Sequence, residues 1–71
     1  MQANLLRAEI AYHGMSYKEL AERAKISTSA FSAKINGQRP FDVDEATRIC
    51  DVLKIEEAEK RANIFLKQMP Q

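Results

Sequence analysis

The chain is poor in the residue types on which several protein classes depend. Its 71 residues include one cysteine, one histidine, two glycines, two prolines and no tryptophan. A single cysteine excludes a disulfide framework and a cysteine-rich metal site. No apolar run approaches the roughly 18 residues of a membrane span, and no charged start followed by an apolar stretch indicates a signal peptide. We therefore expect a cytoplasmic protein with no membrane partner.

The length suits one domain, residues 1–71, and is too short for two. Hydrophobic residues make up 45% of the chain, which is enough for a compact core. The net charge of +1 hides an asymmetry: residues 1–39 hold six bases and three acids, whereas residues 40–71 hold five bases and seven acids. A mildly basic N-terminal half fits a surface that faces phosphates, and it equally fits an ordinary solvated surface.

Residues 16–37, SYKELAERAKISTSAFSAKING, predict two short helices joined by a tight turn. Ser16 and Glu19 have the spacing of a capping box for a helix over residues 17–24. Ser27 can cap a second helix over residues 28–36, and Gly37 can supply the left-handed residue that ends it. Within a small all-helical domain, such a pair usually places its second helix in the DNA major groove.

Three further helices complete an expected all-α, five-helix domain. Apolar spacing predicts helices over residues 4–13, from residue 42 to about residue 53, and over residues 56–66. Residues 38–41 are expected to form a loop, because Pro40 cannot continue a helix and forces the residue before it to be extended. Asp42 with Glu45 then forms another capping box. The expected buried positions are Ala3, Leu5, Leu6, Ile10, Leu20, Ala21, Ala24, Ile26, Phe31, Ile35, Val43, Ala46, Ile49, Cys50, Leu53 and Ile55.

The outward face of the helix over residues 28–36 is expected to read base edges. With Phe31 and Ile35 turned inward, the residues left outside are Thr28, Ser29, Ser32 and Ala33. Hydroxyl groups can donate to or accept from bases, and methyl groups can contact thymine. None of these side chains makes the bidentate contacts of Arg, Asn or Gln. Part of any specificity could therefore come from DNA shape.

Phosphate contacts are predicted on both sides of this helix. The candidates are Ser16, Tyr17, Lys34, Asn36, Gln38 and Arg39. The hydroxyls and free backbone N–H groups at the start of the first helix of the pair suit phosphate oxygens. Alternatively, Asn36 only ends its helix and Lys34 is only a solvated lysine.

The apolar run Ile64, Phe65 and Leu66 is too dense for one helix face. Part of it could enter the core, it could form an exposed patch, or it could pair in extended form with another chain. We favour a surface for a partner or for a dimer within residues 56–71.

Catalytic and cofactor sites are not predicted. His13 is the only histidine, and Cys50 lies on the apolar side of its helix, as a small core residue does. The acids Asp42, Asp44 and Glu45 are explained by helix capping. No glycine-rich loop exists to hold a nucleotide. We expect no enzyme activity, metal, cofactor or small-molecule substrate.

Residues 4–55 resemble the Cro and repressor type of helix-turn-helix proteins, on SYKELAERA, on Ile26-Ser27 and on KING at residues 34–37. More narrowly, FSAKINGQRPFDVDEATRIC followed by a late IFL is similar to small Cro-like proteins of phages from Gram-positive bacteria. The resemblance implies a lambda-repressor-like domain, usually dimeric, that binds an operator and regulates transcription in a lysis–lysogeny switch. It places Tyr17 at a phosphate contact, and Thr28, Ser29 and Ala33 at base-reading positions.

This chain has Lys25 where the family usually has glycine in the turn. A lysine held at positive φ costs about 1 kcal/mol.

Because helix 28–36 lacks Gln, Arg or Asn at its reading positions, a second function stays open: a modulator or antirepressor that keeps the fold and binds a partner repressor. The antitoxin of a toxin–antitoxin pair is a third.

Overall fold

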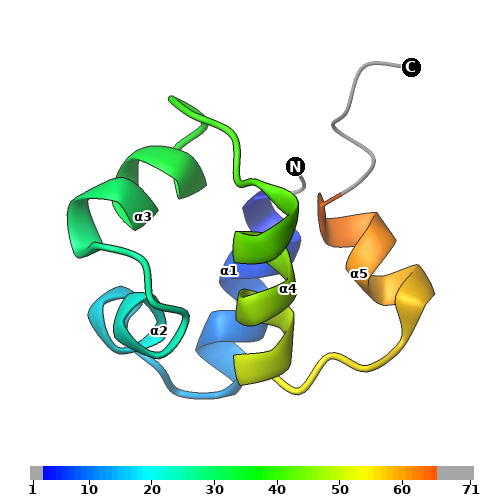
Figure 1. The fold of residues 1–71 in the computed structure, drawn as a ribbon. Helices are drawn as coiled ribbons and strands as arrows, with labels where there is room; N and C mark the ends of the chain where they lie inside the picture. The colour runs from blue at the N-terminus through cyan, green and yellow to red at the C-terminus, as the bar shows by residue number, and fades with distance from the viewer. Residues whose placement is uncertain (1–2, 66–71) are drawn as a thin grey trace.

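The computed structural model describes residues 3–65, and within this range it contains five α-helices and no strand. The helices are α1 (Ala3–Tyr12), α2 (Tyr17–Arg23), α3 (Thr28–Ile35), α4 (Val43–Val52) and α5 (Ala58–Phe65). Helices α2 and α3 form the helix-turn-helix unit, and α4 lies between that unit and α5 (Figure 1). The all-α, five-helix prediction is confirmed. Helix α5 begins two residues later than expected, and residue 66 lies outside the described range.

Three of the helices begin at predicted capping residues. The Ser16 Oγ accepts from the Glu19 backbone N–H at 3.0 Å, and the Ser27 Oγ accepts from the Ala30 N–H at 3.2 Å. Asp42 makes a complete capping box: its Oδ1 accepts from the Glu45 N–H at 2.7 Å, and its own N–H donates to Glu45 Oε1 at 2.9 Å. At Ser16 only the hydroxyl half of the box is present, because the Glu19 carboxylate pairs with Arg23 Nη2 at 3.0 Å.

Helices α1 to α4 all end in the same Schellman motif. In each one the residue after the C-cap has positive φ: Gly14 at 66°, Lys25 at 59°, Gly37 at 84° and Lys54 at 56°. In the turn between α2 and α3, Lys25 N–H donates to Glu22 O at 3.2 Å and Ile26 N–H donates to Ala21 O at 2.9 Å. Ile26 is the last residue of the motif, and the burial of its side chain fixes the direction in which the chain leaves toward α3. The lysine at positive φ is as the sequence predicts.

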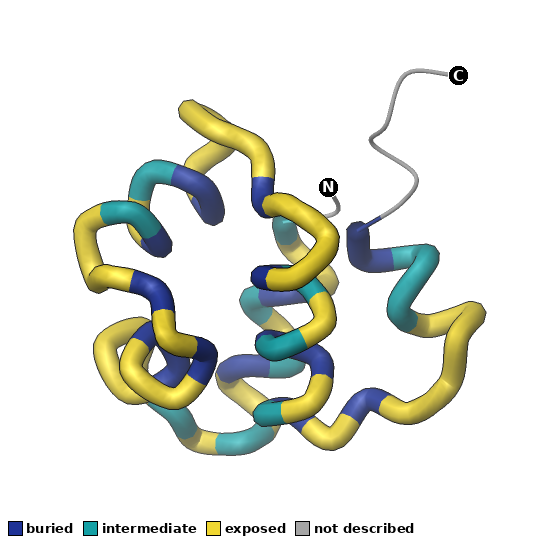
Figure 2. Tube along the Cα trace, in the orientation of Figure 1, coloured by how far each residue is buried: buried dark blue, intermediate teal, exposed yellow. Residues whose placement is uncertain are grey.

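The core lies where the five helices meet (Figure 2). Most of the expected positions are buried, and the fully buried Ala21 and Ala24 allow α2 and α3 to approach closely. Two expectations are wrong. Leu5 is exposed because it lies about 100° around the helix from Leu6, which faces the core. Val43, 67% exposed, is the first residue of α4 and lines an open groove between α4 and α5.

The predicted partner surface at the end of the chain is also wrong for two of its residues. Ile64 is 1% exposed and Phe65 is 6% exposed, so both belong to the core. The Phe65 ring contacts the Phe41 ring edge-on at 5.8 Å, and Phe41 in turn lies 5.7 Å from Phe31. Aromatic packing therefore connects α5 to the helix-turn-helix unit. Leu66, the third residue of this prediction, lies outside the described residues.

Replacing Lys25 by glycine should stabilise the domain, because glycine adopts positive φ without the steric cost of a Cβ. We expect Lys25→Gly to raise the free energy of unfolding by about 1 kcal/mol. Lys25→Ala keeps the Cβ and should leave it nearly unchanged. Urea denaturation followed by circular dichroism measures the free energy of unfolding of both variants. Equal stability of the glycine and alanine variants would show that the backbone at Lys25 is not strained.

Candidate nucleic-acid interface

The outer face of α3 is largely exposed within the part of the chain that the structure describes. Thr28, Ser29 and Ser32 are exposed and Ala33 is half-buried, whereas Phe31 and Ile35 on the opposite side are buried. The two apolar residues lie one helical turn apart, and Phe31 contacts both Tyr17 on α2 and Phe41 just before α4. The four residues predicted to read bases therefore share an accessible face of the helix.

The start of α2 presents Ser16 and Tyr17 at the surface. The Tyr17 ring lies edge-on against Phe31 at 5.5 Å, so a core residue of α3 fixes the direction of this exposed phenol. The Ser16 oxygen accepts the capping bond, and its O–H remains able to donate. Both residues keep the hydroxyl donors on which their predicted phosphate contacts depend.

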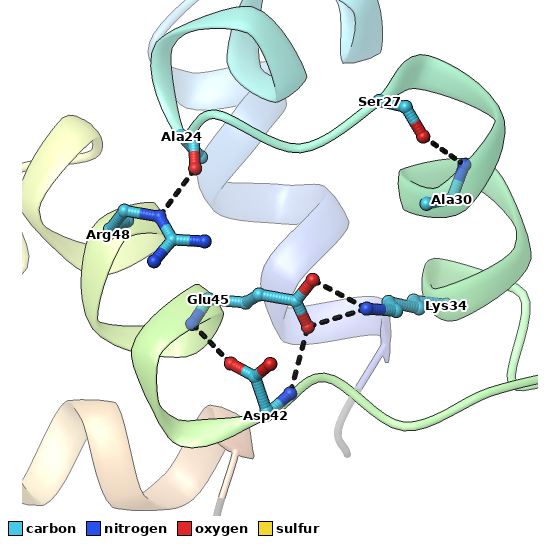
Figure 3. Close-up of polar contacts among 7 residues, drawn as sticks. All are labelled: Ala24, Ser27, Ala30, Lys34, Asp42, Glu45 and Arg48. Atoms are coloured by element: carbon cyan, nitrogen blue, oxygen red, sulfur yellow. Dashed lines mark hydrogen bonds and ion pairs between the residues drawn. The ribbon is translucent and has the colours of Figure 1, made fainter.

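Lys34 does not lie where a phosphate contact requires it. The residue is 8% exposed, and its ammonium Nζ donates to both carboxylate oxygens of Glu45, at 2.6 and 2.5 Å (Figure 3). Its prediction as a phosphate contact is therefore wrong, and so is the alternative of a solvated lysine. The helical period places position 34 about 100° from Ile35, toward α4 and away from the reading face.

The loop after α3 keeps the other predicted phosphate residues exposed: Asn36, Gln38 and Arg39. Sequence reasoning missed Arg7, which joins this cluster from α1. Its Nη2 donates to the Asn36 Oδ1 at 3.0 Å, an exposed contact between residues 29 positions apart. No local spacing could have revealed it, because only the crossing of α1 and the end of α3 brings the two together. The Asn36 amide nitrogen and the other Arg7 N–H groups remain as donors.

Two side chains of α4 bind the helix-turn-helix unit at separate points (Figure 3). Arg48 Nε donates to the Ala24 carbonyl oxygen, 2.7 Å away, at the C-cap of α2. Glu45 holds Lys34 near the end of α3. Within residues 3–65, no buried side-chain nitrogen or oxygen lacks a hydrogen-bond partner. The unit is thus fixed to α4 through both of its helices.

Other chemistry finds little support in the described residues. Burial raises the pKa of the Cys50 thiol, which keeps it protonated and a poor nucleophile at neutral pH. Residues 3–65 contain no group of three or more His, Cys, Asp or Glu side chains that could hold a metal ion. Over the same range, no helix has the length and apolar character needed to cross a bilayer.

Residues 6–59 match the family model of the Cro/C1-type HTH DNA-binding domain. The chain belongs to this family. The matched range begins inside α1, covers α2 to α4 and reaches the start of α5, so it includes the whole helix-turn-helix unit and the helix that fixes it. No curated protein and no solved structure matches the chain. The family assignment makes this Cro/C1-type domain a DNA-binding domain.

Removing the Glu45 carboxylate should be far more damaging than removing an exposed one. Glu45→Ala leaves the Lys34 ammonium buried without a partner, and we expect a loss of about 3–5 kcal/mol in the free energy of unfolding. The matched control is Glu19→Ala, which breaks the exposed pair with Arg23 and should cost about 0.5 kcal/mol. Thermal denaturation compares the two; similar losses would show that burial of the Lys34–Glu45 pair has no energetic consequence.

Proposed function

We propose that this Cro/C1-type domain is a sequence-specific transcription regulator of the phage Cro and repressor kind, and that α3 reads the major groove of its operator. The observation that carries the proposal is the accessible hydroxyl-bearing face of α3, held outward by the burial of Phe31 and Ile35. An α-helix of this kind fits the width of the major groove. The role in a lysis–lysogeny switch rests on the resemblance to small phage Cro-like proteins.

Base contacts are assigned to Thr28, Ser29, Ser32 and Ala33. Short side chains let the α3 backbone approach the base edges closely, and the Ala33 methyl group suits the methyl group of thymine. Because hydroxyl groups discriminate less between bases than bidentate side chains do, we expect sequence-dependent DNA shape to add to the specificity.

Phosphate contacts are assigned to the exposed polar residues that flank this face, Ser16, Tyr17, Asn36, Gln38 and Arg39, and to the half-buried Arg7. The hydrogen bond from Arg7 to Asn36 supports a shared role, because it leaves a guanidinium and an amide donor side by side at the end of α3. Guanidinium groups bind phosphate oxygens with good geometry. Lys34 is excluded from this set by its bond to Glu45.

Two classes of substitution should distinguish the residues that contact phosphates from the residues that read bases. We expect Arg7→Ala or Arg39→Ala to weaken binding to all duplexes and to lower the slope of log affinity against log salt by about one. Thr28→Ala or Ser29→Ala should instead change which sequences are preferred. Gel-shift titration at several salt concentrations measures both, with duplexes selected by the wild-type protein from a pool with a randomised centre.

Lys54→Gln is the matched control, because it removes one positive charge in the turn between α4 and α5, away from α3. This variant should leave the slope of log affinity against log salt unchanged. Failure of the wild-type protein to shift any duplex at micromolar concentration in low salt would contradict the proposed function.

A homodimer is part of the proposal. Two reading helices one DNA turn apart must lie about 34 Å from each other. The domain measures 31 × 25 × 20 Å, so a second copy that meets it on the side away from α3 can place its own α3 at about this distance. That side carries α5, beyond α4 from the helix-turn-helix unit (Figure 1). The exposed Val43 and the apolar groove between α4 and α5 support this side as the contact.

Val43→Asp tests the contact with little risk to folding, because acidic residues are favoured in the first turn of a helix. We expect it to lower affinity for a duplex with two half-sites and to leave binding to a single half-site unchanged. Tyr12→Ser is the control, since Tyr12 is an exposed apolar residue of α1 outside this groove. An unchanged two-site affinity in Val43→Asp would place the dimer contact elsewhere.

The alternative role, a modulator that keeps the fold and binds a partner repressor, loses one of its supports. Ile64 and Phe65 of the apolar run are buried, so they offer no exposed surface to a partner. The lack of Gln, Arg or Asn on the reading face of α3 and the net charge of +1 still favour it, and it stays the second candidate.

A further inference from the structure

We infer that the buried ion pair between Lys34 and Glu45 positions α3 for base reading, so that both residues determine specificity without touching DNA. This inference rests on the proposed function, since it concerns the discrimination between DNA sequences by the same helix. Three observations support it. Lys34 lies on the side of α3 opposite to the reading face, Glu45 is fixed by hydrogen bonds to Asp42, and an ion pair has a defined direction that apolar packing lacks.

Lys34 lies on the side of α3 opposite to the reading face. With 100° between successive residues, Ser32 is about 160° and Ser29 about 140° around the helix from Lys34. Holding Lys34 against α4 therefore fixes the rotation at which these two hydroxyls face outward. The Lys34–Glu45 ion pair lies in the last turn of α3, just before Gly37, which has positive φ. It adds a directional contact to the apolar packing of Phe31 and Ile35 on the same helix.

Glu45 is itself held in a fixed position, which makes it a rigid reference for α3. Its carboxylate accepts two bonds from the Lys34 ammonium and a third from the Asp42 backbone N–H. The backbone N–H of Glu45 donates to Oδ1 of the Asp42 side chain. A shift of this carboxylate would break the first turn of α4, so movement of α3 is coupled to the integrity of that turn.

Stability alone does not require this pair. Desolvation of two charges offsets much of their attraction, and apolar replacements of similar volume are often neutral or stabilising. Apolar packing is non-directional and tolerates small rotations of a helix, whereas a charge-assisted hydrogen bond has a defined length and direction. For a helix whose reading groups are short hydroxyls, a small rotation moves them out of hydrogen-bond range of the bases.

The test compares operator discrimination in folded variants. Lys34→Met/Glu45→Gln removes the ion pair, and the glutamine preserves the capping box because its amide oxygen can accept from Asp42 N–H. The probes are the duplex that the wild-type protein selects from a randomised pool and a scrambled duplex of equal length. We expect the ratio of the two affinities to fall about tenfold, the scale of one lost base-pair contact. Affinity for the scrambled duplex and the salt slope should not change.

Two further variants make the result decisive. Glu19→Ala/Arg23→Ala removes an exposed ion pair from α2 and should keep the wild-type ratio. Lys34→Arg keeps the charge and the pairing but changes the geometry of the anchor, and its ratio should also fall. If the double variant does not fold, as judged by circular dichroism, Lys34→Arg alone decides.

The outcomes are distinguishable. A folded Lys34 variant with the wild-type ratio overturns the positioning role while the proposed function stands. A salt slope lowered by about one in the double variant would show that Lys34 contacts phosphate, and would also overturn it. If the wild-type protein selects no sequence at all, the proposed function fails and the inference fails with it.

Discussion

Helix α4 holds the helix-turn-helix unit through two polar contacts, and the presentation of α3 depends on them. Arg48 binds the carbonyl at the end of α2, and Glu45 binds the ammonium of Lys34 on α3. The same glutamate closes the capping box that begins α4. One carboxylate thus connects the start of one helix to the orientation of another. Around these contacts, apolar packing supplies burial, while the hydrogen bonds supply direction.

The buried pair also changes the charge of the surface around α3, the surface that the proposed function places against DNA. Six bases precede Pro40, and the structure removes one of them, Lys34, from that surface by neutralising it with Glu45. Arg7 is brought to the end of α3 by its bond to Asn36, although it lies on α1. The positive charge near the loop after α3 therefore comes from Arg7 and Arg39, and arginine suits bidentate phosphate contacts better than lysine does.

Much of the fold could be predicted from local chemistry. The helix starts at Tyr17, Thr28 and Val43 follow from the residues before them, which accept hydrogen bonds from free backbone N–H groups. The end of α3 follows from Gly37, and the positive φ of Lys25 follows from its place in the turn. The accessible reading face could also be predicted, because Phe31 and Ile35 occupy one side of a helix. These features depend on residues within a few positions of one another.

The sequence by itself determined that there are five helices, where α2, α3 and α4 begin, and the family of DNA-binding domains to which the chain belongs. Only the tertiary structure decided which charged residues remain available. The sequence predicts Lys34 at the surface and Ile64 at a partner surface, yet Glu45 and the core bury them. Arg7, half-buried on α1, reaches Asn36 at the end of α3, and Val43 stays exposed at the start of α4. The reason is physical: capping and periodicity act within one helix, whereas burial and ion pairing depend on how helices far apart in the chain come together.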